Sequence, residues 1–270
     1  MITMFSYKRT LPQQHPITPL GHLRRQAFGL ANIGGTTDTR PVRQQEVIDH
    51  LISGFNSVLE SSNFDHLQAR VGKSDPAMKT FTYEGVAMAL TILDHLCPDS
   101  HLSPIRFAEY VEKDHIEGVY IGVGLALARL QWPIGRHLRE ADPDFRRWIT
   151  DGYGFGHAIF HAKQTLSKHH IPAHLPHSQQ EDFDIGVGRA LWFRFQAQIQ
   201  PISDTISTFS AHRQSPIWEG TGFAATYGGG GTENALNDLT YQARAYQIDL
   251  QRGIEHARGV QASENNHTHV

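Results

Sequence analysis

Apolar residues recur at helical intervals along most of the chain. Val47, Leu51 and Phe55 fall on one stripe of a predicted helix, because residues three or four apart share a helix face. Val123 and Leu127 repeat this spacing in a segment rich in alanine and leucine, which are good helix formers. Strand-like alternation bounded by hairpin turns is scarce. The pattern therefore predicts an all-α protein.

Start signals support further helices. Ser103 is placed to cap a helix whose first residue is Pro104, a position that proline tolerates well. The segment TENALNDLTYQARAYQIDLQRGIEHAR reads as one long amphipathic closing helix with Thr232 as its cap.

A glycine-led pattern recurs along the chain at intervals of 30 to 37 residues. Small residues follow at the second and fourth positions after most of these glycines, so the unit reads small-x-small-x-small. The pattern is weakest in its first copy. The six leading glycines are Gly54, Gly85, Gly122, Gly152, Gly186 and Gly220.

Glycine inside a helix costs about 1 kcal/mol relative to alanine, so six such clusters need a physical reason. Small side chains allow two helix backbones to approach closely. We therefore expect about six helical hairpins of about 34 residues each, whose inner helices open with the glycines. An α/α toroid is favoured over an open solenoid, because small residues suit helices that crowd together at the centre of a ring.

The domain boundaries follow from this repeat. Residues 1–40 are expected to form an N-terminal arm and a first helix, and residues 41–261 a single all-α helical-repeat domain. Residues 262–270 are expected to be a disordered tail.

Composition narrows the class of protein. The 270 residues carry a formal net charge of −3 and show no basic stripe with interleaved aromatics, so no nucleic-acid partner is expected. The single Cys97 excludes an internal disulfide. The longest apolar run, from Val119, has about 10 residues, whereas a membrane-spanning helix needs roughly 20. The start of the chain lacks the apolar core of a signal peptide. We expect a cytoplasmic protein without a membrane span.

Carboxylates precede the glycines of the second, fourth and sixth copies: Glu84, Asp151 and Glu219. If the repeated helices begin at one rim, these acids converge on one mouth, where burial and mutual repulsion raise their pKa values. One acid could then donate a proton while another accepts one. The alternative is ordinary helix capping, because acids are favoured in the first turn of any helix.

Aromatic residues accompany these acids. We assign substrate contact to the aromatic side chains and to one further acid, Asp184, which stands two positions before the fifth glycine: Tyr83, Tyr153, Phe155, Trp218 and Asp184.

His157 and His161 are four residues apart and would face one side of a helix, as a metal-binding pair does. Asp151 or Glu84 could add a third ligand. The familiar zinc motif has glutamate beside its first histidine, however, and this chain has Ala158 there. Hydrogen-bonded histidines and an acid–base role for His157 are the alternatives. We assign no metal and no cofactor.

Six segments in order resemble a bacterial domain-of-unknown-function family labelled enediyne biosynthesis protein. They are LRRQAFGL, FTYEGVAMALTILD, GVGLALARLQW, DGYGFGHAIFH, GVGRALWF and IWEGTGFAATYGGG, and the resemblance runs from about Leu23 to about Arg252. Members of that family accompany enediyne polyketide synthase cassettes, so the resemblance implies a pathway rather than a reaction. Similar members carry acids at the positions of Glu84, Asp151 and Glu219. They place a histidine directly after GYGF, where this chain has Gly156 followed by His157.

Three functions are compatible with these features. The first is an accessory or tailoring protein of secondary metabolism that binds an apolar, polyene-like intermediate, with acid–base cyclisation or isomerisation as its reaction and polyketide synthase or other pathway proteins as partners. The second is a non-catalytic carrier, self-protection protein or scaffold. The third is a metal-dependent hydrolase that uses His157 and His161.

Overall fold

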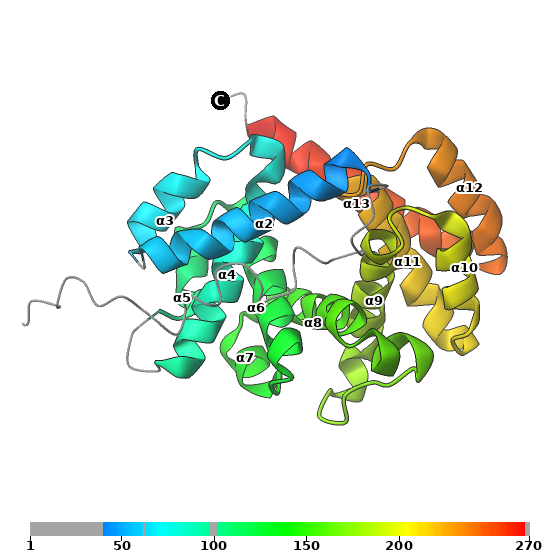
Figure 1. Ribbon diagram of the computed structural model, residues 1–270, viewed down its shortest axis with the longest axis horizontal. Helices are drawn as coiled ribbons and strands as arrows, with labels where there is room; N and C mark the ends of the chain where they lie inside the picture. Colours follow the sequence, from blue (N-terminus) through cyan, green and yellow to red (C-terminus); the bar gives the residue numbers. More distant parts are fainter. Residues whose placement is uncertain (1–39, 62, 98–101, 268–270) are drawn as a thin grey trace, which may run out of the picture.

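The computed structural model describes residues 40–61, 63–97 and 102–267, and every regular element in these ranges is helical (Figure 1). The all-α prediction is confirmed. No helix in the described part of the chain is long and apolar enough to cross a membrane. The expected N-terminal arm lies outside the described residues, apart from Arg40.

Seven long helices form the centre of the described structure, and each packs chiefly against the next one along the chain. They are α2 (Val42–Glu60), α4 (Lys79–Leu96), α6 (Ile116–Leu130), α8 (Arg146–Phe160), α9 (Gln180–Arg194), α11 (Ala211–Tyr227) and α13 (Gln247–His267). We call them the inner helices.

Shorter helices join the inner helices: α3 (Phe64–Val71), α5 (Pro104–Phe107), α7 (Gly135–Glu140), α10 (Ile199–Ser207) and α12 (Glu233–Ala243). The expectation of regular two-helix hairpins is wrong between α8 and α9, where a π-helical turn, η8 (Lys163–Ser167), and a loop replace the outer helix. The predicted single closing helix is also two helices, because Arg244 leaves the helical conformation at φ 50° and ψ −108°.

The glycines lie inside the inner helices and do not open them, which corrects the sequence prediction. Gly85 and Gly152 each lie nearly two turns beyond the first residue of α4 and α8. A 3-10 turn precedes each of these helices, and Asp75 and Asp142 cap these turns by accepting a hydrogen bond from the backbone N–H two residues later. The helices therefore begin at an aspartate–proline signal upstream of the glycine.

The two glycines of one unit contact two different neighbouring helices. A Cβ added to Gly152 would lie 2.1 Å from the carbonyl oxygen of Ile121 in α6, the preceding inner helix. A Cβ on Gly154 would lie 1.9 Å from the carbonyl oxygen of Phe183 in α9, the following one. Residues two apart differ in direction by about 200° around a helix, so small-x-small places one glycine on each side.

Close contacts between a glycine and a carbonyl oxygen also occur in the first and last inner helices. A Cβ on Gly253 in α13 would lie 1.9 Å from the carbonyl oxygen of Glu219, which makes α13 a seventh unit that the sequence analysis missed. Gly54 in α2 meets Thr82 of the following helix, α4, so it matches the second glycine of the other units. The first copy looks weak because Ile52 occupies its leading position, two residues before Gly54.

The end of the last inner helix returns to the start of the second. Glu264 of α13 accepts hydrogen bonds from Thr80 of α4 at 2.7 Å and from Tyr227 of α11 at 2.6 Å, and it lies 3.3 Å from Nδ1 of His115. Because α13 runs to His267, this part of the expected tail is helical. The closed-ring arrangement stays a prediction.

Substituting Gly188→Ala tests the close approach of α9 and α11. The new Cβ would lie 1.9 Å from the carbonyl oxygen of Ile217, a backbone atom that cannot move alone, so we expect a loss of about 3 kcal/mol or more in unfolding free energy. Gly259→Ala in α13 is the matched control. Its Cβ meets nothing within 4 Å, so helix propensity should raise stability by about 0.5–1 kcal/mol. Chemical denaturation measures both, and equal effects would contradict the packing account.

Candidate functional site

Side chains one residue before and three residues after the leading glycine of each unit lie on one side of an inner helix, because they are four residues apart. We call this side the inner face. Its centre is an ion pair in which Nη1 of Arg189 in α9 donates to Oδ1 of Asp151 in α8 at 2.6 Å. Both side chains are buried. Removing one partner of such a pair would leave an uncompensated buried charge, which is strongly destabilising.

Aromatic rings surround the guanidinium of Arg189. It lies 5.9 Å from the ring centroid of Phe155 and 5.2 Å from that of Phe223, within the range of cation–π interactions. Trp148 contacts the rings of Phe223 and His256 at centroid distances of 6.4 and 5.7 Å. The inner face thus combines one neutralised ion pair with aromatic surfaces from α8, α11 and α13.

Glu84 of α4 lies in the same electrostatic environment. Its side chain is 4% exposed, and its Oε1 has no hydrogen-bond partner. Burial raises the pKa of Glu84 to about 7, the Arg189 guanidinium opposes this rise, and the Asp151 carboxylate adds to it. A carboxyl group with this pKa exchanges its proton near neutral pH, as a general acid or base must.

Glu117 of α6 is a second carboxyl group with a raised pKa, which the sequence analysis missed. Burial raises the pKa of Glu117 to about 7, Arg147 and Arg189 oppose the rise, and Asp151 and Glu264 add to it. In this copy of the repeat, Ile121 stands directly before the glycine. A search for acids at that position therefore does not find Glu117. The helical spacing was the available signal, since Glu117 lies one turn before Ile121.

The three predicted acids differ in their surroundings. Burial is the largest cause that raises the pKa of Asp151, the Arg189 ion pair opposes it, and Glu219 adds repulsion. Glu219 itself pairs with Arg252 of α13 at 2.6 Å, and the Arg252 side chain is half exposed. Glu84 and Asp151 therefore both interact with Arg189. Glu219 repels Asp151 but forms its own ion pair with Arg252.

Helix capping, the alternative explanation of these acids, is wrong. The first turns of α4, α8 and α11 contain no acidic residue, and Glu84, Asp151 and Glu219 lie in the middle of their helices. Residues this far into a helix donate their backbone N–H groups within it, so these acids have no free N–H group to cap.

Asp184 lies apart from the inner-face pair. Its carboxylate accepts two hydrogen bonds from Arg213 of α11, at 2.8 and 2.5 Å, and both side chains are buried. Arg213 also donates to the carbonyl oxygen of His169 at 2.7 Å. This arrangement joins the start of α11 to α9 and to the loop after η8.

Two of the predicted aromatic contacts point elsewhere. Tyr83 packs on the rings of Phe107 and His115, with centroid distances of 6.1 and 6.0 Å. The hydroxyl of Tyr153 donates to the carbonyl oxygen of Trp132 at 3.2 Å and lies 2.9 Å from Nε2 of His174. Both tyrosines thus contact the outer segments.

The other two predicted aromatics are also buried. Phe155 contacts Arg189 on the inner face, as described above, and Trp218 is 3% exposed.

His157 and His161 do not form a three-ligand metal group in the described structure. Nε2 of His161 contacts the carbonyl oxygen of Ala128 at 3.0 Å, and its Nδ1 contacts Gln131 at 3.2 Å, so both nitrogens are engaged. His157 is buried against Tyr153. Burial lowers the pKa of His157 to about 3, which keeps it neutral. The hypothesis of a metal-dependent hydrolase needs a third ligand beside His157 and His161, and the described residues place none there.

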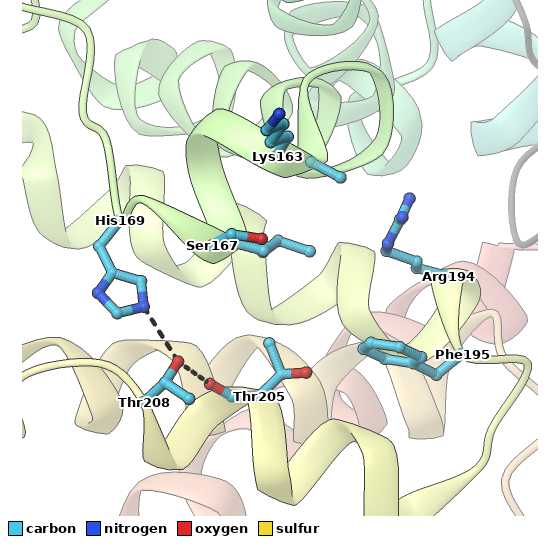
Figure 2. Close-up of a pocket in the computed structure, with 9 residues that line it drawn as sticks. Lys163, Ser167, His169, Arg194, Phe195, Thr205 and Thr208 are labelled. Carbon is cyan, nitrogen blue, oxygen red and sulfur yellow. Dashed lines mark hydrogen bonds between the residues drawn. The ribbon is translucent and has the colours of Figure 1, made fainter.

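A separate surface groove of about 600 Å³ lies between η8, the end of α9 and α10 (Figure 2). Its polar lining consists of cations, hydroxyls and His169, with none of the predicted acids: Lys163, Ser167, His169, Arg194, Thr205 and Thr208. The Thr208 hydroxyl donates to the Thr205 carbonyl oxygen at 2.7 Å, so it accepts from Nε2 of His169 at 3.0 Å. This groove shares no residue with the inner face.

The raised pKa of Glu84 predicts a pH-dependent stability. The folded chain binds the Glu84 proton more tightly than the unfolded chain, in which the pKa of Glu84 is near 4.5. The protonated carboxyl group therefore contributes its full stabilisation of the folded state below pH 4.5. This stabilisation is lost as the pH rises to about 7. Glu84→Gln stays neutral throughout, so its unfolding free energy relative to wild type should rise by roughly 2 to 3 kcal/mol between pH 5 and pH 8. Denaturant titrations at both pH values measure this.

Glu109→Gln, at an exposed position, is the control for that measurement and should show no such rise. An unchanged difference between Glu84→Gln and wild type at the two pH values would show that Glu84 is ionised throughout.

Comparison with known proteins identifies a family for this chain. No curated protein and no solved structure matches the chain. A family profile described as "Protein of unknown function (DUF1702)" matches residues 28–270, which agrees with the domain-of-unknown-function family expected from the sequence motifs. Because the match covers most of the 270 residues, the chain belongs to the DUF1702 family.

Proposed function

We propose that this chain is an accessory or tailoring protein of bacterial secondary metabolism that binds an apolar, polyene-like intermediate at its inner face and transfers protons to and from it. The observation that carries the proposal is the buried carboxyl group of Glu84. It has an unpartnered oxygen and a pKa near 7, and Arg189 and Asp151 act on it electrostatically. An unsatisfied buried polar group costs free energy, which a functional role explains.

The reaction that these groups support is an acid–base isomerisation or cyclisation. Protonated Glu84 donates its proton to a carbon–carbon double bond, which forms a C–H bond and leaves a cationic carbon. A second double bond can attack that carbon to form a ring. Loss of a proton to a carboxylate, Glu84 itself or Glu117, restores a double bond. The substrate gains and loses one proton, so no oxidant or reductant is needed.

The aromatic side chains around Arg189, which acts electrostatically on Glu84, suit such a cation. The faces of Phe155 and Phe223 already hold the Arg189 guanidinium, and aromatic faces stabilise positive charge in general. The Asp151 carboxylate neutralises Arg189, so the arginine adds little net repulsion. Apolar walls with a few placed polar groups are typical of small-molecule sites.

The proposal also assigns a pathway to this protein. The sequence motifs resemble proteins that accompany enediyne polyketide synthase cassettes, so we infer an enediyne or polyketide-type intermediate, synthase proteins as partners, and action in the cytoplasm.

A non-catalytic carrier is the second candidate. The observation that favours it is the pairing of Asp151 with Arg189 and of Glu219 with Arg252, which leaves much of the inner face neutral and aromatic. Such a surface can bind an apolar molecule without changing it.

Amide variants in the organism that encodes the chain separate these two candidates. Glu84→Gln keeps the size of the side chain but cannot donate a proton, so we expect the pathway product to fall at least tenfold at unchanged protein level. Glu117→Gln should lower it less, and the double variant should abolish it. Chromatography with mass detection quantifies the product.

Glu109→Gln, at its exposed position, is the matched control and should give the wild-type yield. Wild-type yields from Glu84→Gln and from the double variant, with folded protein, would exclude proton transfer and leave the carrier function.

A further inference from the structure

Three potential metal ligands meet at the end of α4, away from the inner face. They are Asp94 and His95, in the last turn of α4, and His137, in α7. One ligand atom from each lies within 4.8 Å of the others, and no other group of this kind occurs in the described residues. Asp94 follows Glu84 by ten residues on the same helix, which is about 15 Å along its axis. The cluster is therefore separate from the proposed acid–base site.

His137 provides the independent sign of a missing partner. Its side chain is 1% exposed, yet neither ring nitrogen has a hydrogen-bond partner. A neutral imidazole carries one N–H and one lone pair, so burying both unpaired costs free energy. A metal ion would satisfy that lone pair.

The hydrogen bond that His95 makes to the backbone places its lone pair on one known nitrogen. Its Nδ1 lies 3.0 Å from the carbonyl oxygen of Thr91, and a carbonyl can only accept, so the proton is on Nδ1 and the lone pair on Nε2. The ring stacks on Trp132 at 4.2 Å and faces His137 at 5.2 Å between centroids. A hydrogen bond from the non-ligating nitrogen to a carbonyl is typical of metal-bound histidine.

Asp94 supplies the negative charge. Its Oδ2 lies 3.0 Å from Nη2 of Arg136, whose Nε also donates to Glu140 at 2.9 Å. The Arg136 side chain is 45% exposed, so it can remain on Glu140 or hold one oxygen of Asp94 while the other oxygen binds a cation. The carbonyl end of the α4 dipole favours a cation at the same place.

We propose that Asp94, His95 and His137 bind a divalent transition metal ion of the zinc type, which ties the end of α4 to α7. Two imidazoles and one carboxylate are a ligand set that Zn²⁺ and Fe²⁺ accept, with the remaining positions left to water. Zinc–ligand bonds of about 2.0–2.2 Å require the three side chains to turn toward one another on binding. This site adds to the function proposed above and does not depend on it.

Zinc binding to the full chain without an affinity tag tests the site. After dialysis against a chelator, calorimetric titration with ZnCl₂ should show one tight site, and Co²⁺ should give the visible absorption of a low-coordinate complex. His95→Gln and His137→Gln should each weaken that site at least tenfold, and saturating zinc should raise the melting temperature of wild type but of neither variant. His95 is partly exposed, so its variant tests the site even if replacing buried His137 prevents folding.

His177→Gln is the matched control, because His177 is exposed in the histidine-rich segment near 169–177, where metal could bind adventitiously. It should bind zinc as wild type does. The proposal is overturned if wild type binds no zinc, if His95→Gln retains wild-type affinity, or if His177→Gln alone removes the binding.

Discussion

The close approach of helix backbones at glycine determines the rest of this structure. In seven successive inner helices, glycines face the carbonyl oxygens of a neighbouring helix, at positions where a Cβ would come within about 1.9 to 2.6 Å of that oxygen. At this separation glycine Cα–H groups can contact carbonyl oxygens directly, which adds weak hydrogen bonds to the packing. Larger side chains at the contact would separate the helices and remove the support that positions the inner face.

The glycine contacts explain which features of the fold the sequence predicted. Helix content and the repeat were visible because small residues two apart recur at regular intervals. The helix starts were misplaced because the glycine was read as an opening residue, whereas Asp75 and Asp142 mark the true beginnings with a following proline. The break at Arg244 was not predictable, since no glycine or proline marks it and a positive φ is uncommon for residues other than glycine.

The candidate site was predicted in part, for a related reason. A position defined relative to the glycine identifies a helix face, so Glu84, Asp151 and Phe155 were found together. Their partner Arg189 was missed because it stands three residues after its glycine, in a unit that has no acid before it. Tyr83 and Tyr153 were misassigned because residues adjacent in sequence point about 100° apart on a helix. Pairing between units depends on which helices become neighbours, and a single sequence does not show that.

The opposite placement of the two glycines also bears on how such a protein can diversify. The contacts between units use main-chain atoms. They therefore place little constraint on which side chains the units carry on the inner face. Acids, arginines and aromatic rings can be exchanged there with the frame intact, as the differences among the seven units of this chain already illustrate. One inherited frame could thus host several chemistries across its lineage.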